Sequence, residues 1–133
     1  TRIGYSCESA EDLDLNKTKI FKAVLYMILV VYVFQIKDVL GKVTHLSHER
    51  WKHIQGHPFM YEHLESIQTT LKKPLTIRYF EDVEETLYFY TEFKEHQQAE
   101  RYLMVAVRYL NGNGFVVTSF FTDRITGILW KAK

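Results

Sequence analysis

Apolar residues are most concentrated between positions 20 and 34, where the run IFKAVLYMILVVYVF contains a single charge, Lys22. β-Branched and aromatic residues predominate in its second half, which favours a buried strand that begins near Ile28 or Leu29. The run is fifteen residues long, whereas a transmembrane helix needs about twenty. Residues 1–19 are polar and mildly acidic, unlike the basic start of a signal peptide. We therefore expect no membrane contact, and a partial membrane anchor is the less favoured alternative.

The pattern that follows predicts a hairpin and then two short helices. Residues 37–41 (KDVLG) indicate a turn, and residues 42–46 would return as a short strand. Ser47 is a suitable N-cap for a helix over residues 48–54, which would end at the Gly56 and Pro58 that follow it. Apolar residues at near-helical spacing then predict a second helix over residues 61–71.

The rest of the chain has the composition of strands. Four segments rich in β-branched and aromatic residues are separated by polar or glycine-containing turns, and the turn NGNG predicts that the last two strands form an antiparallel hairpin. These segments are residues 75–80, 86–93, 101–110 and 114–122. The predicted fold is therefore α+β, with an N-terminal strand and hairpin and two short helices packed on a four-stranded antiparallel meander.

Alternation along the last of these strands divides its side chains between the two faces of the sheet. Thr118, Phe120 and Thr122 are expected on one face, and Val117, Ser119 and Phe121 are expected on the other. Because threonine is common in strands, these hydroxyls are also compatible with an ordinary strand surface.

Composition narrows the class of protein. A chain of 133 residues with 15% aromatic residues is long enough for one well-filled domain, which we expect over residues 29–133, after a polar leader and the start of the apolar run at residues 1–28. The net charge of +1 gives no global signature of nucleic-acid binding, so a basic site must be local. Cys7 is the single cysteine and allows no internal disulfide, which fits a reducing, cytoplasmic location.

Titratable residues are densest between positions 45 and 60, which hold four of the six histidines. In the predicted helix, Arg50 and His53 flank the apolar stripe, and His57 follows just after the break. This arrangement suggests an anion site at the rim of the core. A solvated helix with one buried aromatic residue is the alternative interpretation. Zinc is less favoured, because Gly56 interrupts the helical spacing of His53 and His57.

The same residues carry a resemblance to a known family. The pattern H-L-S-x-E-R-W-x-H-I-x-x-H-P-x-M, the later I-R, the strand G-F-V-V-T-S-F-F-T-D-R-I and the final I-L-W together resemble the phage-associated Barnase/EndoU/colicin/RelE-like (BECR-fold) nucleases. The resemblance extends from about residue 31 to residue 130. It implies helices followed by a four-stranded antiparallel sheet, and a toxin-like or mobile-element-associated endoribonuclease that cleaves RNA without a metal or cofactor.

The resemblance and the chemistry of RNA cleavage together imply roles for specific residues. Histidine transfers protons near neutral pH, arginine binds phosphate, and aromatic rings stack on bases. The expected site comprises His53 and His57 for proton transfer, Arg50 and Arg78 for phosphate, Thr118 and Thr122 for hydrogen bonds, Tyr88 or Tyr90 for stacking, and His45 and His48 in reserve. RNA is the expected partner, and the family also allows an inhibitory antitoxin or immunity protein. A non-catalytic protein- or nucleic-acid-binding module of the same fold is the alternative.

Overall fold

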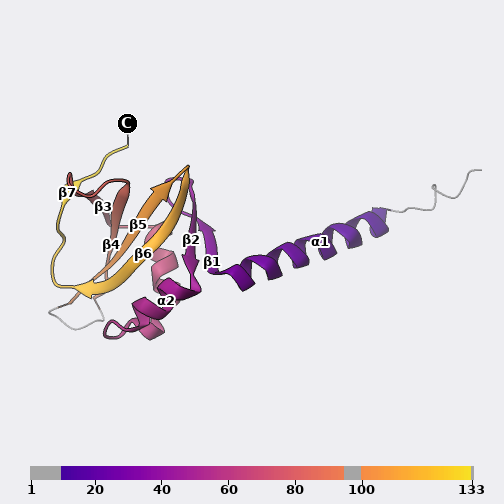
Figure 1. Ribbon diagram of the computed structural model, residues 1–133, viewed down its shortest axis with the longest axis horizontal. Helices are drawn as coiled ribbons and strands as arrows, with labels where there is room; N and C mark the ends of the chain where they lie inside the picture. Colours follow the sequence, from indigo (N-terminus) through magenta and orange to yellow (C-terminus); the bar gives the residue numbers. More distant parts are fainter. Residues whose placement is uncertain (1–9, 95–99, 133) are drawn as a thin grey trace, which may run out of the picture. The chain divides into compact units, whose positions relative to one another are not determined.

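The computed structural model describes residues 10–94 and 100–132, with side chains from residue 16 onward (Figure 1). Cys7 therefore lies outside the described residues. The chain divides into two compact units, one ending at Val31 and the other beginning at Tyr32. The features that concern function all lie in the second unit.

The first unit contains the helix α1 (Ala10–Val31). The prediction of a strand from Ile28 or Leu29 is therefore wrong, because the helix continues to Val31 and the strand β1 (Tyr32–Lys37) begins only after it. Helix propagation is cooperative, so β-branched residues at the end of an established helix are tolerated despite their strand propensity. Among the described residues, no helix is both long enough and apolar enough to cross a bilayer.

The second unit is built on one seven-stranded mixed sheet with the strand order β1-β2-β6-β5-β4-β3-β7. After β1, the strands are β2 (Val43–Ser47), β3 (Thr76–Tyr79), β4 (Thr86–Glu92), β5 (Tyr102–Leu110), β6 (Asn113–Thr122) and β7 (Ile128–Leu129). The α+β class is confirmed, and β3 to β6 form the expected antiparallel meander. The sheet is nevertheless larger than predicted, because the β1–β2 hairpin joins β6 in parallel and β7 extends the other edge.

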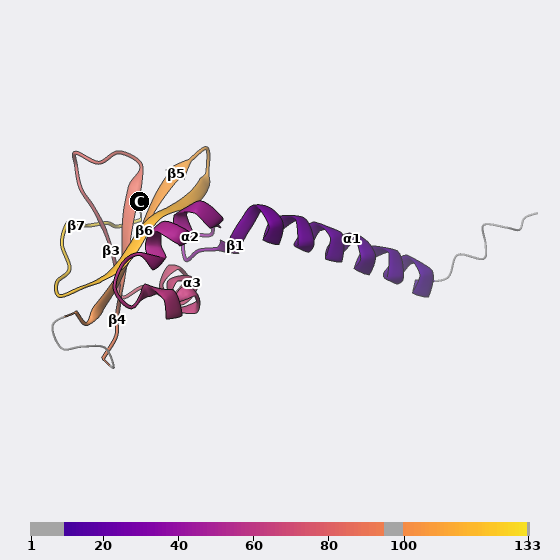
Figure 2. The same ribbon diagram turned by 60° about the horizontal axis from the view of Figure 1, so that its bottom comes forward.

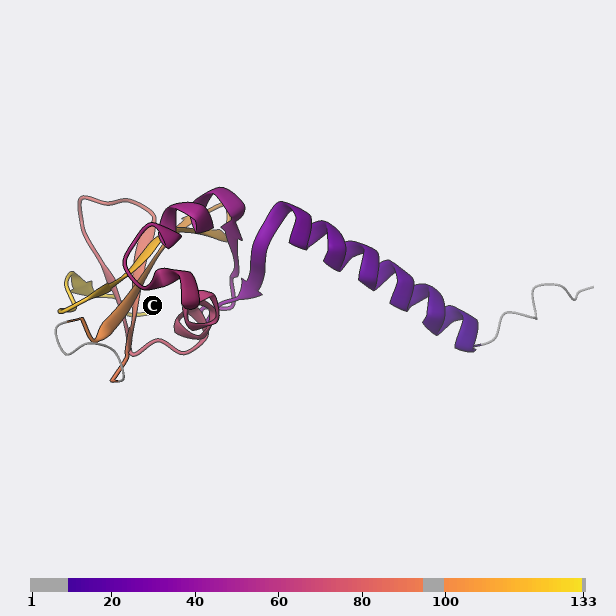
Figure 3. The ribbon, with the colours of Figure 1, turned by 90° about the horizontal axis from the view of Figure 1, so that it is seen from below.

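Two helices of this unit connect β2 to β3. Helix α2 (His48–Gln55) has the predicted N-cap, since the Ser47 hydroxyl accepts a hydrogen bond from the Arg50 amide at 3.1 Å. A 3₁₀ helix, η2 (Met60–Glu62), follows, and α3 (Leu64–Lys72) begins three residues later than predicted. Figures 2 and 3 both show α2 and α3 on the same side of the sheet.

The two faces of the sheet differ in what packs on them. On the helix-bearing face, Ile54 of α2 and Leu71 of α3 are fully buried in the main core, which also includes Val105 of β5. On the opposite face, which we call the open face, Tyr90, Met104 and Ala106 form a smaller cluster. Among the described residues of this unit, the loop 123–127 crosses this cluster, with Ile125 packed against it.

A β-bulge in β6 determines which of its side chains reach the open face. The register moves from Val116 opposite Val107 to Thr118 opposite Ala106, so Val117 is the extra residue. The prediction that Thr118, Phe120 and Thr122 share a face is confirmed. Val117 itself packs against the open-face cluster instead of lying with Ser119 and Phe121, because the bulge interrupts the alternation.

Candidate functional site

A row of side chains crosses the open face over four neighbouring strands. Arg78 of β3 lies opposite Tyr88 of β4, Tyr88 lies opposite Ala106 of β5, and Ala106 lies opposite Thr118 of β6. Directly opposed residues of antiparallel strands point to the same face. Three residues predicted from separate segments, Arg78, Tyr88 and Thr118, therefore belong to one surface.

His57 joins this row at its β6 end. Strand β2 pairs with β6 through Thr44 and His45, and no other strand of the described residues lies on that side of β6. Helix α2 packs beside β6 there, and the chain after it brings His57 to the sheet. The His57 Nε2 and Thr118 Oγ1 atoms are 3.4 Å apart, with the donor set by the histidine tautomer. A partly buried imidazole is thus held against a strand hydroxyl.

Two aromatic contacts further define the position of His57. Its ring lies 5.4 Å, centroid to centroid and edge to face, from the ring of His53, which is exposed on α2. Its ring also lies 5.5 Å from the ring of Phe120, one alternation along β6 from Thr118. The two histidines assigned to proton transfer therefore adjoin each other at one end of the open face.

An aromatic cleft of about 380 Å³ extends from Phe120 across the open face. Its lining combines four aromatic rings with the polar residues of the crossing loop: Phe80, Tyr88, Tyr90, Met104, Phe120, Thr122, Asp123, Arg124 and Thr126. The Tyr90 hydroxyl lies 3.4 Å from the Thr126 hydroxyl, which ties the loop to the floor of the cleft. Flat aromatic walls beside a histidine pair suit a planar group such as a nucleobase.

The pKa of Tyr88 is raised above its ordinary value, mainly by burial and secondarily by the neighbouring Tyr90 and Asp82. Its hydroxyl is therefore neutral near pH 7 and can donate a hydrogen bond into the cleft. A neutral phenol also avoids repelling a phosphate.

Arg78 lies half-buried at the other end of the row. Its Nη1 atom donates to the Gly127 carbonyl at 3.4 Å, and its Nε atom is buried without a hydrogen-bond partner among the described residues. Within that same part of the chain, no carboxylate forms an ion pair with it. A buried guanidinium in this situation favours binding of an anion. At the rim, Arg124 is exposed and pairs with Asp123 at 3.4 Å.

The other predicted site residues have different surroundings. His45 is buried, with Nδ1 3.1 Å from the Gly114 carbonyl and its ring between those of Tyr32 and Phe115, so it serves packing. His48 and Arg50 are exposed on α2, and neither lines the aromatic cleft. Thr122 lines the cleft, and its hydroxyl contacts the backbone of Arg124.

Sequence reasoning missed part of the cleft. Phe120 was placed on the correct face but was not assigned to the site, although its position between Thr118 and Thr122 was a usable signal. Asp123 and Arg124 follow the strand directly, yet only the crossing of the loop brings them over the sheet.

The described residues contain no group of three or more histidine, cysteine, aspartate or glutamate side chains arranged to hold a metal ion. Comparisons of this chain with family models, curated proteins and solved structures give no match. The function must therefore be argued from the site itself.

Proposed function

We propose that this chain is a small metal-independent endoribonuclease, toxin-like or mobile-element associated, that cleaves RNA by transesterification from the ribose 2′-hydroxyl. The observation that carries the proposal is the contact between His57 and Thr118 at the end of an aromatic cleft. The resemblance to BECR-fold nucleases points in the same direction. The proposal implies RNA in the cytoplasm as the substrate and allows an inhibitory partner protein.

The chemistry needs two proton transfers. A base removes the 2′-hydroxyl proton while the 2′-oxygen attacks phosphorus, and an acid protonates the departing 5′-oxygen, leaving a 2′,3′-cyclic phosphate. We assign these transfers to His57 and to its neighbour His53. Thr118 is a positioning residue, because its hydroxyl fixes the orientation of the His57 ring.

Binding of the substrate uses the rest of the open face. Arg78 lies at the opposite end of the row from His57, so it supplies positive charge to a neighbouring phosphate of the bound RNA rather than to the phosphate being cleaved. Tyr88, Tyr90 and Phe120 provide surfaces on which a base stacks. A low net charge is compatible with this assignment, because binding a phosphate requires a local cation such as Arg78 rather than a basic protein.

The second candidate function is a non-catalytic module that binds nucleic acid or protein through the same cleft. The exposure of His53 favours it, since a proton-transfer group usually has a partner that orients it.

The test is cleavage of mixed-sequence RNA by the purified chain in the presence of EDTA. We expect 2′,3′-cyclic ends, no cleavage of DNA of the same sequence, and loss of activity in His57→Ala. Thr118→Val should lower kcat while leaving KM nearly unchanged, because it acts through the orientation of His57.

Gln55→Ala is the matched control, since Gln55 is the exposed last residue of α2, two positions before His57, and does not line the cleft. Cleavage that persists in His57→Ala would contradict the assignment of that histidine. A folded protein that binds RNA but leaves it intact would support the non-catalytic module.

A further inference from the structure

Two cavities adjoin on the helix-bearing face of the sheet, near the edge formed by β3 and β7. Their volumes are about 650 Å³ and about 480 Å³, and Leu40, Leu129 and Trp130 line both. We call the combined depression the Trp130 groove. Leu87 and Tyr109 also line the larger half, and Leu75 and Ile77 also line the smaller half. The groove is separate from the aromatic cleft, with which it shares no residue.

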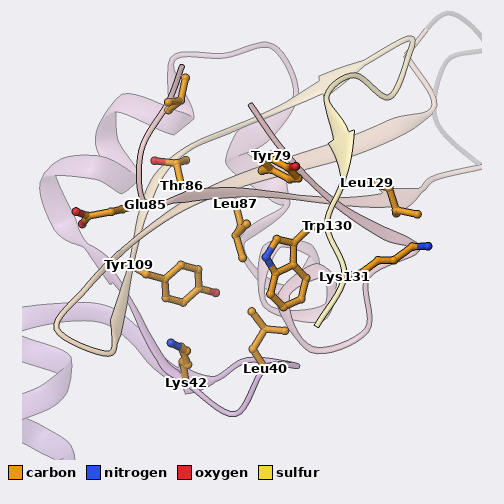
Figure 4. Close-up of a pocket in the computed structure, with 11 residues that line it drawn as sticks. Leu40, Lys42, Tyr79, Glu85, Thr86, Leu87, Tyr109, Leu129, Trp130 and Lys131 are labelled. Atoms are coloured by element: carbon orange, nitrogen blue, oxygen red, sulfur yellow. The ribbon is translucent and has the colours of Figure 1, made fainter. Parts of the chain in front are cut away.

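The walls of the larger half are fixed by hydrogen bonds. The Tyr109 hydroxyl donates to the buried Asp38 carboxylate at 2.5 Å, and the backbone amide of Trp130 donates to the Ile77 carbonyl at 2.9 Å. In Figure 4, Tyr109 and Trp130 face each other across the cavity, with Leu40 and Leu87 between them. A cavity with walls held in this way exists before any ligand arrives, which lowers the entropic cost of binding.

Apolar side chains around the groove are unusually exposed. Val39, Leu75, Val83 and Leu129 line it with relative exposures of 49%, 60%, 39% and 46%. Single exposed apolar residues are ordinary, but several gathered around one depression are typical of a surface that binds a protein.

Charged side chains around the groove are mostly basic. Lys42, Lys72, Lys73 and Lys131 contribute four exposed lysines, whereas Glu85 is the single acidic residue of the lining. Lys42 lies over the Tyr109 ring at 5.5 Å from its centroid, while Glu85 and Lys131 project from the rim in Figure 4. The complementary ligand therefore combines apolar side chains with negative charge.

The shape of the groove favours an extended ligand. Its two halves lie on either side of the shared residues Leu40 and Trp130, so a ligand that fills both must be elongated. The groove also reaches β7, the outermost strand of the sheet, which among the described residues pairs only with β3. Such an edge can pair with an added extended segment.

We propose that the Trp130 groove binds an extended acidic segment of a partner protein, with one apolar side chain in each half. The segment lies along β7, and its carboxylates face the lysines at the rim. A nucleic acid fits less well, because it has no aliphatic side chains for the pockets formed by Leu40, Leu87 and Leu129. This proposal does not rest on the ribonuclease proposal.

The test uses the full chain and the synthetic peptide acetyl-Glu-Asp-Phe-Glu-Leu-Glu-Asp-amide as the probe. Indole N–H signals in a ¹H–¹⁵N correlation spectrum report the two tryptophans separately. We expect the Trp130 signal to shift on titration and the Trp51 signal, from α2, to stay in place. The same peptide with serine for its two apolar residues, or with lysine for its acids, should bind at least about tenfold more weakly.

Charge reversal identifies the site. Lys42→Glu combined with Lys73→Glu should weaken binding of the probe by about tenfold, and Leu75→Ser should also weaken it. Lys52→Glu is the matched control, because Lys52 is an exposed lysine of α2 that does not line the groove, and it should leave binding unchanged. Circular dichroism verifies that each variant is folded.

Three results would overturn the proposal. One is an unmoved Trp130 signal at saturating probe, and another is a stronger shift with the lysine peptide or with a short single-stranded RNA. The third is a Trp130 shift that depends on protein concentration without any probe, which would assign the groove to a second copy of this chain.

Discussion

Asp38 offers the sharpest test of how this fold is held together. Its carboxylate is only 5% exposed, yet it has no cationic hydrogen-bond donor among the described residues. Four neutral groups donate to it instead: the Leu40 amide at 2.9 Å, the Lys42 amide at 3.0 Å, the Thr44 hydroxyl at 2.8 Å and the Tyr109 hydroxyl at 2.5 Å. These bonds join the β1–β2 turn to β5, so Asp38→Ala should destabilise the sheet.

The loss of stability expected for Asp38→Ala depends on the surroundings of each donor. The Leu40 and Lys42 amides lie in a surface turn, where water can replace the carboxylate at little cost. The Thr44 hydroxyl is fully buried and the Tyr109 hydroxyl is partly buried, so each loses its hydrogen bond to a charged acceptor, at about 1–3 kcal/mol. We therefore expect a loss of about 2–5 kcal/mol in the free energy of unfolding.

Asp38→Asn separates hydrogen bonding from charge. The amide oxygen can still accept from the two backbone amides, and the Thr44 and Tyr109 hydroxyls can rotate to accept from the new NH₂ group. Its loss should therefore be about half that of Asp38→Ala. The measurement is urea unfolding followed by circular dichroism, with Glu81→Ala, an exposed carboxylate, as a control expected within about 0.5 kcal/mol of the wild type. A loss below about 1 kcal/mol for Asp38→Ala, or equal losses for both variants, would refute the reasoning.

Three further predictions concern single positions. Gly114→Ala should lower stability by about 1–3 kcal/mol in urea unfolding, because a Cβ there meets the Thr44 hydroxyl. Gly112→Ala should cost about 1 kcal/mol, because the space around Gly112 is open but its φ is +81°. In urea unfolding repeated at a series of alkaline pH values, Tyr109→Phe should lose less stability than the wild type as the pH rises. Burial and the bond to Asp38 raise the pKa of Tyr109 in the folded state, so its contribution is complete below about pH 10 and declines as the pH rises further. Ser47→Ala should cost about 1 kcal/mol and speed hydrogen exchange of the α2 amides, and unchanged exchange there would contradict the capping role.

Local signals in the sequence were sufficient for several elements. Ser47 was identifiable as an N-cap because its side chain type and the residues after it satisfy a local rule, and the NGNG turn specified the β5–β6 hairpin in the same way. The end of α1 was not predictable in this manner. The apolar residues around Ile28 are common both in strands and in apolar helices. A short, continuous apolar run has no periodicity that distinguishes the two.

Long-range pairing was beyond the sequence. A strand was expected over residues 42–46 and is observed one residue later, as β2, but nothing local shows that this strand joins β6 in parallel. Gly114 is a residue that this pairing requires, because any larger side chain there would collide with Thr44 of β2. The glycine was interpreted only as part of a turn, because its second role depends on a neighbour seventy positions away in the chain.

The candidate site shows why density of histidines along the chain does not predict their convergence in space. Four histidines lie between positions 45 and 60, but His45 is used for packing, whereas His57 contacts the Thr118 hydroxyl of the sheet. Two irregularities produce that contact. Strand β2 ends at Ser47, so among the described residues the far half of β6 pairs with β5 alone, and the bulge at Val117 turns Thr118 to the open face. A longer β2 would occupy the position of His57, and a regular β6 would direct Thr118 into the core. The chemistry proposed here therefore depends on the points at which regular strand pairing stops, and those points are set by tertiary packing rather than by local sequence.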